Sequence, residues 1–448
     1  MYDARSPAEP LTVRLFHRYP RDMRPATQRL APADEANLVL DHAGQVNVFL
    51  VAALLAPGGF LAPDGTADIA ALRAVLHERI AQLPALRKTA VQAGRRHHWI
   101  EAIPDLEHHI RAVEPVDGLT GLGDRCAELM GQPLAGDRPM WEILVVPGAT
   151  AGGLGVVLRI HHAVADGMTA AVIVQRLFDP GEPVESPLNQ PSARGPAEAP
   201  RRHPRNDPRS TLRRLGTGLS RIRKTLWGQG VGRTVLLGER SAHHGVAFLQ
   251  TEIEALEAAV RPWGATVNDA LLAASAAGFR AALLAAGEPV PAWLPVSEPV
   301  ALRRRGTAGN QVGVMLVRLP LGEPDPDERL RLIAAQTRDE KLRARDQGTL
   351  EFMRGPIGAR VMDHLARRQH LVGGFVTNVP GPKGAFLLAG APVTALWPVA
   401  VLAGNVRLGV AAVSYAGNLC CGIHFDASNV PGDVFARAMG EELARLGR

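Results

Sequence analysis

Hydrophobic residues recur at helical spacing in several segments of the chain and form short continuous runs in others. Apolar positions repeat every three or four residues along a buried helix face, whereas strands alternate or run apolar throughout. The pattern predicts helices over residues 67–83, 167–178, 251–264 and 266–287. It predicts strands over residues 141–146, 154–160, 310–321 and within 405–425. Helices and strands therefore mix in both parts of the chain, which is typical of an α/β or α+β fold.

The middle of the chain interrupts this pattern. Residues 179–208 are rich in proline and polar groups and contain almost nothing that a core could bury, which is typical of a linker. The linker divides the chain into two parts of similar length. We therefore expect an amino-terminal half over residues 1–180, a basic proline-rich linker and helix over 181–235, and a carboxy-terminal half over 236–448.

An amphipathic segment follows the proline-rich stretch. Its apolar residues recur at spacings of three and four and form one stripe on a helix; they are Leu212, Leu215, Leu219, Ile222 and Leu226. Basic side chains cover the other faces, as on helices that lie on anionic membranes. The alternative is a connector helix that packs its stripe on the protein. We favour the connector, because Gly216 and Gly218 weaken the helix in isolation.

The net charge of +6 is concentrated in the same region. Ten basic and two acidic residues lie between Arg194 and Lys224, so this segment carries +8 and the rest of the chain −2. The basic character therefore belongs to one segment and not to the fold. The segment lacks interleaved aromatic residues and a recognisable nucleic-acid-binding module, so no nucleic-acid partner is expected.

Composition excludes several classes of protein. Of the 448 residues, 46% are hydrophobic and 21% charged, which is ordinary globular usage and excludes a wholly disordered or collagen-like chain. The three cysteines, Cys126, Cys420 and Cys421, are odd in number and lack the spacing of a disulfide framework or a zinc site. They are consistent with a reduced, intracellular protein, and no metal ligand set is expected.

Membrane and export signals are weak. The amino terminus has no apolar core of signal-peptide length, so secretion is not expected. The longest uncharged stretch, Gly384–Val406, could span a bilayer by length, but Pro392 and Pro398 interrupt it. We interpret it as buried strand and turn.

One segment carries candidate chemistry, at residues 158–167 with the sequence LRIHHAVADG. A predicted strand delivers His161 and His162 to its end, a short turn follows, and Asp166 and Gly167 open the next predicted helix. A neutral imidazole held at such a turn can take a proton from a hydroxyl as the hydroxyl attacks a carbonyl group. Glycine at this place lets another backbone approach closely.

Three other interpretations remain open for this segment. Histidine pairs also occur at residues 97–98, 108–109 and 243–244, so the dipeptide alone means little. Asp166 could serve only as a helix N-cap. A metal site is a third interpretation, but adjacent histidines on a strand point to opposite faces and chelate poorly.

The histidine-histidine-x-x-x-aspartate-glycine pattern resembles that of the coenzyme A-dependent acyltransferase superfamily, which includes peptide-synthetase condensation domains. Further segments resemble one branch, the bacterial wax ester synthase/diacylglycerol acyltransferase family, in family order and over nearly the whole chain except the linker. These segments are LAPADEANLVLD (30–41), PLAGDRPMWEILVV (133–146), ATVNDALLA (265–273), GNQVGVMLVRLP (309–320), TNVPGPKGAFLLAGAPV (377–393) and SYAGNLCCGIHFD (414–426).

The resemblance implies a fold and a reaction. It implies two chloramphenicol-acetyltransferase-like α/β halves, joined by a linker, with the active-site channel between them. It implies transfer of a fatty acyl group from acyl-CoA, as co-substrate, to the hydroxyl of a long-chain alcohol or diacylglycerol, giving wax ester or triacylglycerol. No tightly bound cofactor is implied.

The resemblance also implies roles for individual residues. His162 would be the general base, with His161 and Gly167 in the same catalytic motif, and Asp166 would hold the loop in shape by pairing with an arginine. Asn268 would orient the substrate or stabilise the oxyanion, with a helix cap as the alternative.

Four further positions are expected to bind substrate. Asn378, Pro380 and Gly381 belong to a segment that would line the channel, or would form only a tight turn. Ser414 would contact substrate, or would be an ordinary strand residue with a satisfied hydroxyl group.

Three segments depart from the family pattern. Residues 45–48 read Gln-Val-Asn-Val where the family usually has a Met-His-Val-like segment. Residues 238–248 replace an Asn-Gly and Arg-bearing stretch, and residues 295–306 look longer than usual. These changes leave the histidine motif intact and leave the acceptor and the acyl chain length open.

Because of these departures, two alternative functions stay open. One is a specialised acyltransferase or condensation-type enzyme that uses a carrier-protein thioester or another alcohol. Another is a non-catalytic lipid-binding protein, which the intact His162, Asp166 and Gly167 argue against. The resemblance implies a cytoplasmic protein with peripheral attachment to the inner membrane face or lipid bodies, where the basic linker would meet anionic lipid or the phosphates of coenzyme A.

Overall fold

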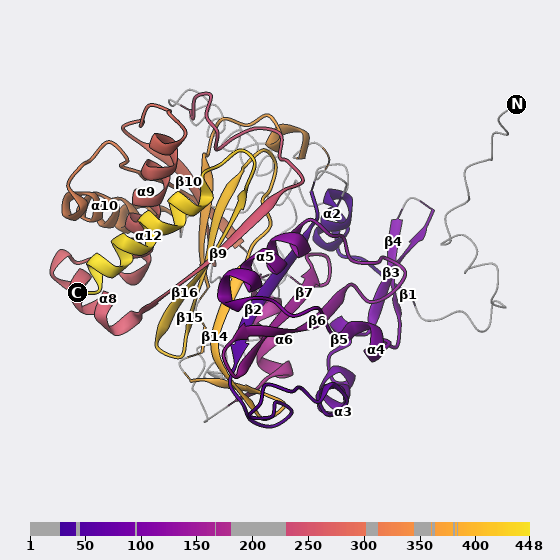
Figure 1. The fold of residues 1–448 in the computed structure, drawn as a ribbon. Helices are drawn as coiled ribbons and strands as arrows, with labels where there is room; N and C mark the ends of the chain where they lie inside the picture. Colours follow the sequence, from indigo (N-terminus) through magenta and orange to yellow (C-terminus); the bar gives the residue numbers. More distant parts are fainter. Residues whose placement is uncertain are drawn as a thin grey trace, which may run out of the picture.

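The computed structural model describes residues 27–41, 45–94, 96–165, 167–180, 230–301, 312–344, 360, 363–379, 381–382 and 384–448. The predicted linker helix, most of the predicted linker, Asp166 and Pro380 lie outside these residues. Figure 1 shows the two halves side by side, each built on a large twisted sheet.

The first half contains a seven-stranded sheet in the order β5-β6-β7-β2-β14-β13-β8. Its strands are β2 (Val48–Leu55), β5 (Ile110–Ala112), β6 (Trp141–Thr150), β7 (Gly153–His161), β8 (Asp179–Pro180), β13 (Phe386–Leu388) and β14 (Ala391–Val399). A separate three-stranded sheet contains β1 (Thr27–Arg29), β4 (Arg96–Glu101) and β3 (Lys88–Ala93). The helices of this half are α2 (Pro32–Leu40), α3 (Ile69–Ala81), α4 (Leu106–His109), α5 (Gly118–Met130) and α6 (Gly167–Leu177), with a 3₁₀ turn at Pro84–Leu86.

Strand β7 lies inside this sheet, between β6 and β2 and antiparallel to both. All nine of its residues are buried, as its apolar sequence predicts. The buried Arg159 is compensated by an ion pair with Glu142 on β6 and by hydrogen bonds to backbone carbonyls at the end of α5. The strand that carries the histidines is therefore held rigidly on both edges.

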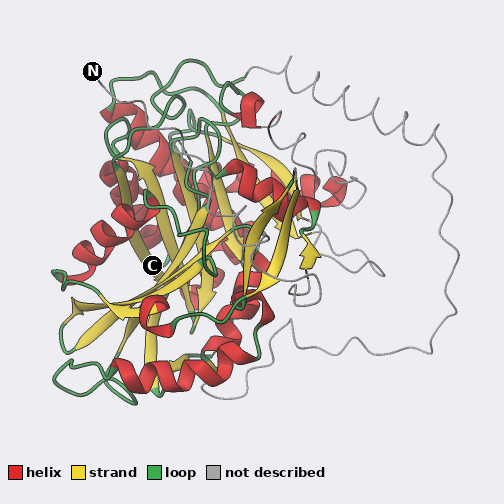
Figure 2. Ribbon diagram, turned by 90° about the vertical axis from the view of Figure 1, so that its right-hand side faces the viewer, coloured by secondary structure: helices red, strands yellow, loops and turns green. Residues whose placement is uncertain are grey.

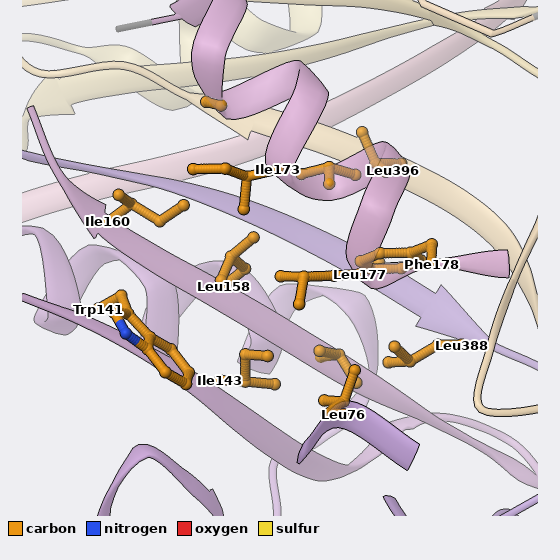
Figure 3. Close-up of a cluster of buried hydrophobic side chains, with 14 of the residues drawn as sticks. Leu76, Trp141, Ile143, Leu158, Ile160, Ile173, Leu177, Phe178, Leu388 and Leu396 are labelled. Carbon is orange, nitrogen blue, oxygen red and sulfur yellow. The ribbon is translucent and has the colours of Figure 1, made fainter. Parts of the chain in front are cut away.

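Helices α3 and α6 cover one face of this sheet and form its core (Figure 3). Figure 3 shows Ile173 of α6 above Leu158 and Ile160 of β7, Leu177 of α6 beside Leu158, and Leu76 of α3 at the lower side of the cluster. Because α6 begins at Gly167, directly after the histidine turn, this packing anchors the chain on the far side of the turn.

The second half contains a six-stranded sheet in the order β11-β10-β12-β15-β16-β9. Its strands are β9 (His244–Glu252), β10 (Leu294–Ala301), β11 (Val312–Leu319), β12 (Gly374–Val379), β15 (Leu408–Tyr415) and β16 (Asn418–Asp426). Its helices are α8 (Ile253–Val260), with a 3₁₀ turn at Arg261–Trp263, α9 (Val267–Ala285), α10 (Pro326–Ala344) and α12 (Gly432–Leu446), which cover one face of the sheet (Figures 1 and 2).

Helix α9 is the core helix of this half. Among the described residues it is the one helix long and apolar enough to cross a membrane, and 67% of its apolar window is buried inside the protein against its neighbours. It packs on α12, where Phe279 meets Phe435 edge to face. Its apolar character is therefore accounted for by the core.

The carboxy-terminal part of the chain contributes strands to the sheet of the first half. Strand β14 comes from the carboxy-terminal part of the sequence, yet it pairs with β2 in the first sheet, with Val399 opposite Leu50. This confirms the interpretation of Gly384–Val406 as buried strand and turn. Helix α5 lies at the same junction, and Gly123 packs directly on the backbone of Val246 in β9.

The predicted elements within the described residues are confirmed, with one shifted boundary, and several observed elements were not predicted, among them α2, α10 and α12. The segment 251–264 begins two residues inside β9, so the helix starts only at Ile253 and ends at Val260. Helix α5, for example, was not predicted, because its three glycines, at positions 118, 121 and 123, weaken the helical pattern. Tertiary packing between the halves compensates for this low propensity.

Candidate active site

The histidine turn follows β7 directly. His161 is the last residue of the strand and lies opposite Val48 on β2. The backbone N–H groups of Val164 and Ala165 donate to the carbonyl of His161, at 2.9 and 3.4 Å, and close a tight turn. His162 is the first residue of this turn, so its position depends on how the turn is fixed.

His161 is buried, and both of its ring nitrogens have partners inside the protein. Its Nδ1 accepts a hydrogen bond from the backbone N–H of Ala163 at 3.0 Å. Its Nε2 lies 3.2 Å from Oδ2 of Asp41. Because Nδ1 accepts, the proton of the neutral ring is on Nε2 and is donated to the carboxylate. His161 thus anchors the turn to the residue that ends α2.

His162 is partly buried, and its backbone is held on both sides. Its N–H donates to the carbonyl of Asn47 at 3.0 Å, and its carbonyl accepts from Nδ2 of Asn37 at 3.2 Å. Its imidazole lies edge-on to the ring of Phe49, with the centroids 5.0 Å apart. The backbone of this residue is therefore as well defined as a strand position, although it lies in a turn.

Two asparagines link these contacts. Nδ2 of the buried Asn47 donates to the backbone carbonyl of Asn37 at 2.9 Å and to its side-chain oxygen at 3.2 Å. The backbone N–H of Asn47 donates to Oδ1 of Asp41 at 3.0 Å. Asn37, Asp41 and Asn47 thus form one network that touches both histidines.

Asn268 lies in the second half, in the first turn of α9. The helix is capped by Thr266 and Asp269, whose side chains bond each other's backbone N–H groups in a capping box. The alternative that Asn268 is a helix cap is therefore wrong. Its Nδ2 donates to Oε1 of the buried Glu298 on β10 at 2.9 Å, so the side chain faces the sheet.

Asn378, near the end of β12, lies beside Asn268. Its Nδ2 donates to Oδ1 of Asn268 at 3.5 Å, a long hydrogen bond. Its own Oδ1 is a buried acceptor for which no hydrogen-bond partner exists among the described residues. Buried acceptors are normally satisfied, and an open one in a cluster of amides is suited to a hydroxyl or amide N–H of a ligand.

Gly381 and Ser414 lie against each other beyond this strand end. A Cβ atom on Gly381 would lie 1.9 Å from the backbone oxygen of Ser414, so only glycine permits this contact. The structure therefore brings Asn268 to Asn378 and Gly381 to Ser414, in the second half. The contacts of His161 and His162 described above are made with the amino-terminal half.

A cavity of about 400 Å³ lies between the halves. Its walls combine apolar side chains with Arg240, His244 and His424, and the residues at its lining include Gln45, Val46, Met130, Val401 and Leu402. Gln45 joins the halves directly, because its Oε1 accepts from the backbone N–H of Gly404 at 3.0 Å. The cavity therefore adjoins the same short segment, residues 45–47, that holds His162.

Two histidines of this cavity bond each other. Nδ1 of His244 and Nε2 of His424 are 2.9 Å apart, and Nδ1 of His424 lies 2.8 Å from the carbonyl of Ala400. The carbonyl can only accept, so His424 donates through Nδ1 and accepts through Nε2. Burial, together with the neighbouring His244, lowers the pKa of His424 to about 3, and burial also lowers the pKa of His244.

Other titratable groups are less suited to chemistry. Cys126, Cys420 and Cys421 are buried, and burial raises the pKa of each thiol, so none is a ready nucleophile. Among the residues that the structure describes, no group of three or more His, Cys, Asp or Glu side chains could hold a metal ion.

Sequence analysis missed the polar partners of the site: Asn37, Asp41, Asn47 and Glu298. Asn37 and Asp41 lie in the quoted motif LAPADEANLVLD, Asn37 in the last turn of α2 and Asp41 directly after the helix, so the motif itself was a usable signal. Asn47 was noted only as a departure from a family pattern. Glu298 was visible as a single acidic residue in a segment that pairs as a buried strand.

The fold and the site together define an α/β protein with one large sheet in each half and a histidine turn at the end of an inner strand of the first. Comparison with known proteins extends this description. Residues 30–271 match the wax ester synthase/diacylglycerol acyltransferase catalytic domain, and residues 308–447 match the carboxy-terminal domain of the same family. The chain belongs to the wax ester synthase/diacylglycerol acyltransferase family and is an acyltransferase.

Individual proteins agree with this assignment. The probable diacylglycerol O-acyltransferase tgs1 of Mycobacterium tuberculosis is 28% identical over 375 residues, which cover 78% of each chain. The solved wax ester synthase/diacylglycerol acyltransferase from Marinobacter aquaeolei VT8 has a TM-score of 0.68 at 20% identity and covers 94% of this chain and 98% of its own.

A peptide-synthetase domain has the same fold. The starter condensation domain of rhizomide synthetase, solved with C8-CoA and Leu-SNAC, has a TM-score of 0.55 at 14% identity, over 98% of this chain and 96% of its own. At such identities these structures establish the fold alone. The expected family, fold class and enzyme class are thus confirmed.

Proposed function

We propose that this protein transfers a fatty acyl group from acyl-CoA to the hydroxyl of a long-chain alcohol or diacylglycerol, with His162 as the general base. The observation that carries the proposal is the histidine turn. His161 uses both ring nitrogens to fix the turn, and the backbone of His162 is held through both its N–H and its carbonyl. An imidazole on such a support is preorganised for proton transfer.

The reaction needs one base and no covalent enzyme intermediate. As the alcohol oxygen attacks the thioester carbonyl, His162 accepts the hydroxyl proton, because an alcohol is too weak an acid to ionise beforehand. The tetrahedral intermediate then collapses, the carbon–sulfur bond breaks, and the coenzyme A thiolate leaves. A free thiol has a pKa of roughly 8.5, so the thiolate can take the proton back from the imidazolium.

Asn268 and Asn378 are assigned to substrate orientation. An amide nitrogen carries two N–H groups, and Glu298 accepts from one of those on Asn268. We assign the other to the substrate carbonyl or the oxyanion. The open Oδ1 of Asn378 supports a role in accepting a donor on the substrate.

The remaining motif residues complete the proposal. Asp166 would hold the turn in shape, and Gly167 starts α6 directly behind it. Pro380, Gly381 and Ser414 would line the channel, and the close contact of Gly381 with Ser414 supports this placement. The cavity between the halves supports a substrate route that passes the segment holding His162.

We place the reaction in the cytoplasm, at the surface of the inner membrane or of lipid bodies. Both acceptor classes are poorly soluble amphiphiles that partition into such surfaces. Acyl-CoA is the donor in this proposal, and no tightly bound cofactor takes part.

The first experiment measures coenzyme A thiol release with a panel of long-chain alcohols and diacylglycerol. For His162→Ala we expect kcat to fall by about 10²- to 10⁴-fold, the usual contribution of a general base. The matched control is His77→Ala, on the exposed face of α3, which should keep its activity within about twofold.

Two outcomes would contradict the proposal. Full activity of His162→Ala would remove His162 from the chemistry. The wild-type protein could instead be inactive with every acyl-CoA and acceptor but active with a carrier-protein thioester. Acyl-CoA would then be wrong as the donor, and His162→Ala, assayed with the carrier-protein thioester, would test the base.

A further inference from the structure

The end of helix α2 touches both histidines of the turn through side chains that have no assigned role. We propose that Asp41, Asn37 and Asn47 form a positioning clamp, which fixes His162 in its productive orientation from outside the histidine motif. The inference rests on the proposed function of His162 as base. None of the three residues is a catalytic residue, because each acts through the turn.

The first part of the clamp is a closed hydrogen-bond circuit. His162 donates its N–H to the carbonyl of Asn47, Asn47 donates through its side chain to Asn37, and Asn37 donates through Nδ2 back to the carbonyl of His162. Both backbone polar groups of His162 are thereby fixed by two residues. The ring of Phe49 packs beside the imidazole of His162, with the centroids 5.0 Å apart.

The second part is the Asp41 carboxylate. Its Oδ1 accepts the N–H of Asn47 and its Oδ2 accepts Nε2–H of His161. The carboxylate therefore selects the tautomer of His161 that leaves Nδ1 free to accept the N–H of Ala163. The Asp41 side chain thus links two residues to the end of α2: His161, which precedes His162, and Asn47, whose carbonyl accepts the N–H of His162.

The residue types match these demands. Asn37 must both accept and donate through one side chain, which an amide can do and a carboxylate cannot. Asp41 must accept from two N–H groups, which a carboxylate can do and an amide cannot do without turning its own N–H groups toward a donor. Asn47 and His161 are buried, so a mismatch at either position leaves a polar group unpaired away from water.

Clamping of this kind has a predictable kinetic effect. A displacement of a catalytic group by about 1 Å can cost on the order of 100-fold in rate, even when the change lies outside the chemistry. Loss of the clamp should therefore lower kcat while substrate binding, which uses other residues, changes little. A general loss of folded protein would instead lower the amount of active enzyme without a change in the kcat of the folded fraction.

The test is Asp41→Asn, which keeps the size of the side chain and removes one acceptor. We expect kcat to fall by about 10- to 100-fold, with KM for acyl-CoA within about threefold of the wild type. The matched control is Asp34→Asn, the same substitution in the first turn of the same helix, with kcat expected within about twofold.

A second variant and a double mutant separate positioning from folding. Asn37→Asp places a carboxylate against the carbonyl of His162 and should lower kcat to a similar extent. In the His162→Ala background, Asp41→Asn should cause no further loss of the residual activity, because the clamp acts through His162. A purely structural effect would lower activity equally in both backgrounds.

The outcomes distinguish the clamp from the proposed base. If His162→Ala is inactive and Asp41→Asn keeps the kcat of the wild type, the clamp is wrong and the base stands. If Asp41→Asn lowers the residual activity of His162→Ala by the same factor as in the wild type, the clamp is also wrong. If His162→Ala is fully active, the proposed function itself fails, whatever the clamp variants do.

Discussion

Two histidine pairs lie near the junction of the halves, and they are built differently. His161 and His162 are neighbours in the sequence, and their rings take separate partners, a carboxylate for His161 and the edge of Phe49 for His162. His244 and His424 are 180 residues apart, and their rings bond each other, with a backbone carbonyl behind His424.

The difference shows what decides the use of a histidine. His424 is buried, donates to a carbonyl and accepts from another histidine, so burial keeps its pKa near 3 and its ring neutral. Such a ring is a structural hydrogen-bonding group. In the first pair both ring nitrogens of His161 hold the turn, and His162 is the first residue of that turn.

Over the whole range from pH 6.5 to 3, the largest effect should come from acidifying the second pair. The folded protein keeps His424 neutral, while in the unfolded chain it binds a proton below a pH of about 6.5. The free energy of unfolding therefore falls as the pH drops from about 6.5 toward 3, by up to about 1.4 kcal/mol for each pH unit. Urea denaturation of the wild type and of His424→Leu at pH 7 and pH 5 measures the contribution of His424 to this pH dependence.

At pH 7 the variant should be less stable, because His244 and the carbonyl of Ala400 each lose a partner. At pH 5 the difference should shrink by roughly 2 kcal/mol, since the leucine that replaces His424 binds no proton and other groups titrate equally in both proteins. A difference that is the same at both pH values would show that His424 is not held neutral by the fold.

The next effect concerns the anchor of the first pair. His161→Leu removes one partner of the Asp41 carboxylate and leaves the buried N–H of Ala163 without its acceptor. We expect the free energy of unfolding to fall by about 2–3 kcal/mol, measured by urea denaturation at pH 7. The kcat of the folded protein should fall as well. A stable variant with unchanged kcat would show that His161 does not anchor the turn.

The smallest effect should come from His244→Leu. It removes one hydrogen bond to His424 and leaves the bond from His424 to Ala400 in place, so a loss of about 1 kcal/mol is expected. The adjacent and exposed His243 supplies the control, and His243→Leu should change the free energy of unfolding by less than about 0.5 kcal/mol. Equal effects at the two positions would mean that the ring-to-ring bond contributes nothing.

The local pattern of apolar residues was sufficient to predict several helices and strands of the fold. The predicted helix at 67–83 is α3 and the predicted strand at 154–160 is β7, because each has a clear apolar period and needs few distant partners to be recognised. Helix α5 and the crossing of β14 into the first sheet were beyond local pattern. The first depends on packing between the halves, and the second on which strand edges are open after folding.

The candidate site divides in the same way. The motif residues from His161 to Gly167 could be selected because they are contiguous and resemble a family. Asn37, Asp41, Asn47 and Glu298 could not, since a hydrogen-bond partner is defined by distance in space. Asn268 shows that sequence position near a helix start does not identify the capping residue. Its side chain faces the sheet, and Thr266 and Asp269 form the cap.

The sequence by itself determined the family, those helices and strands that have a clear apolar period, and the segment that carries the histidines. These depend on side-chain type and on spacing along the chain. The tertiary structure decided which histidine is an anchor, which is kept neutral by burial, and which side chains hold the turn. The physical reason is that tautomer, pKa and orientation depend on the groups within a few ångströms of a ring, and at this site those groups come from the end of α2 and from the residue before β2, which are distant in sequence from the histidines.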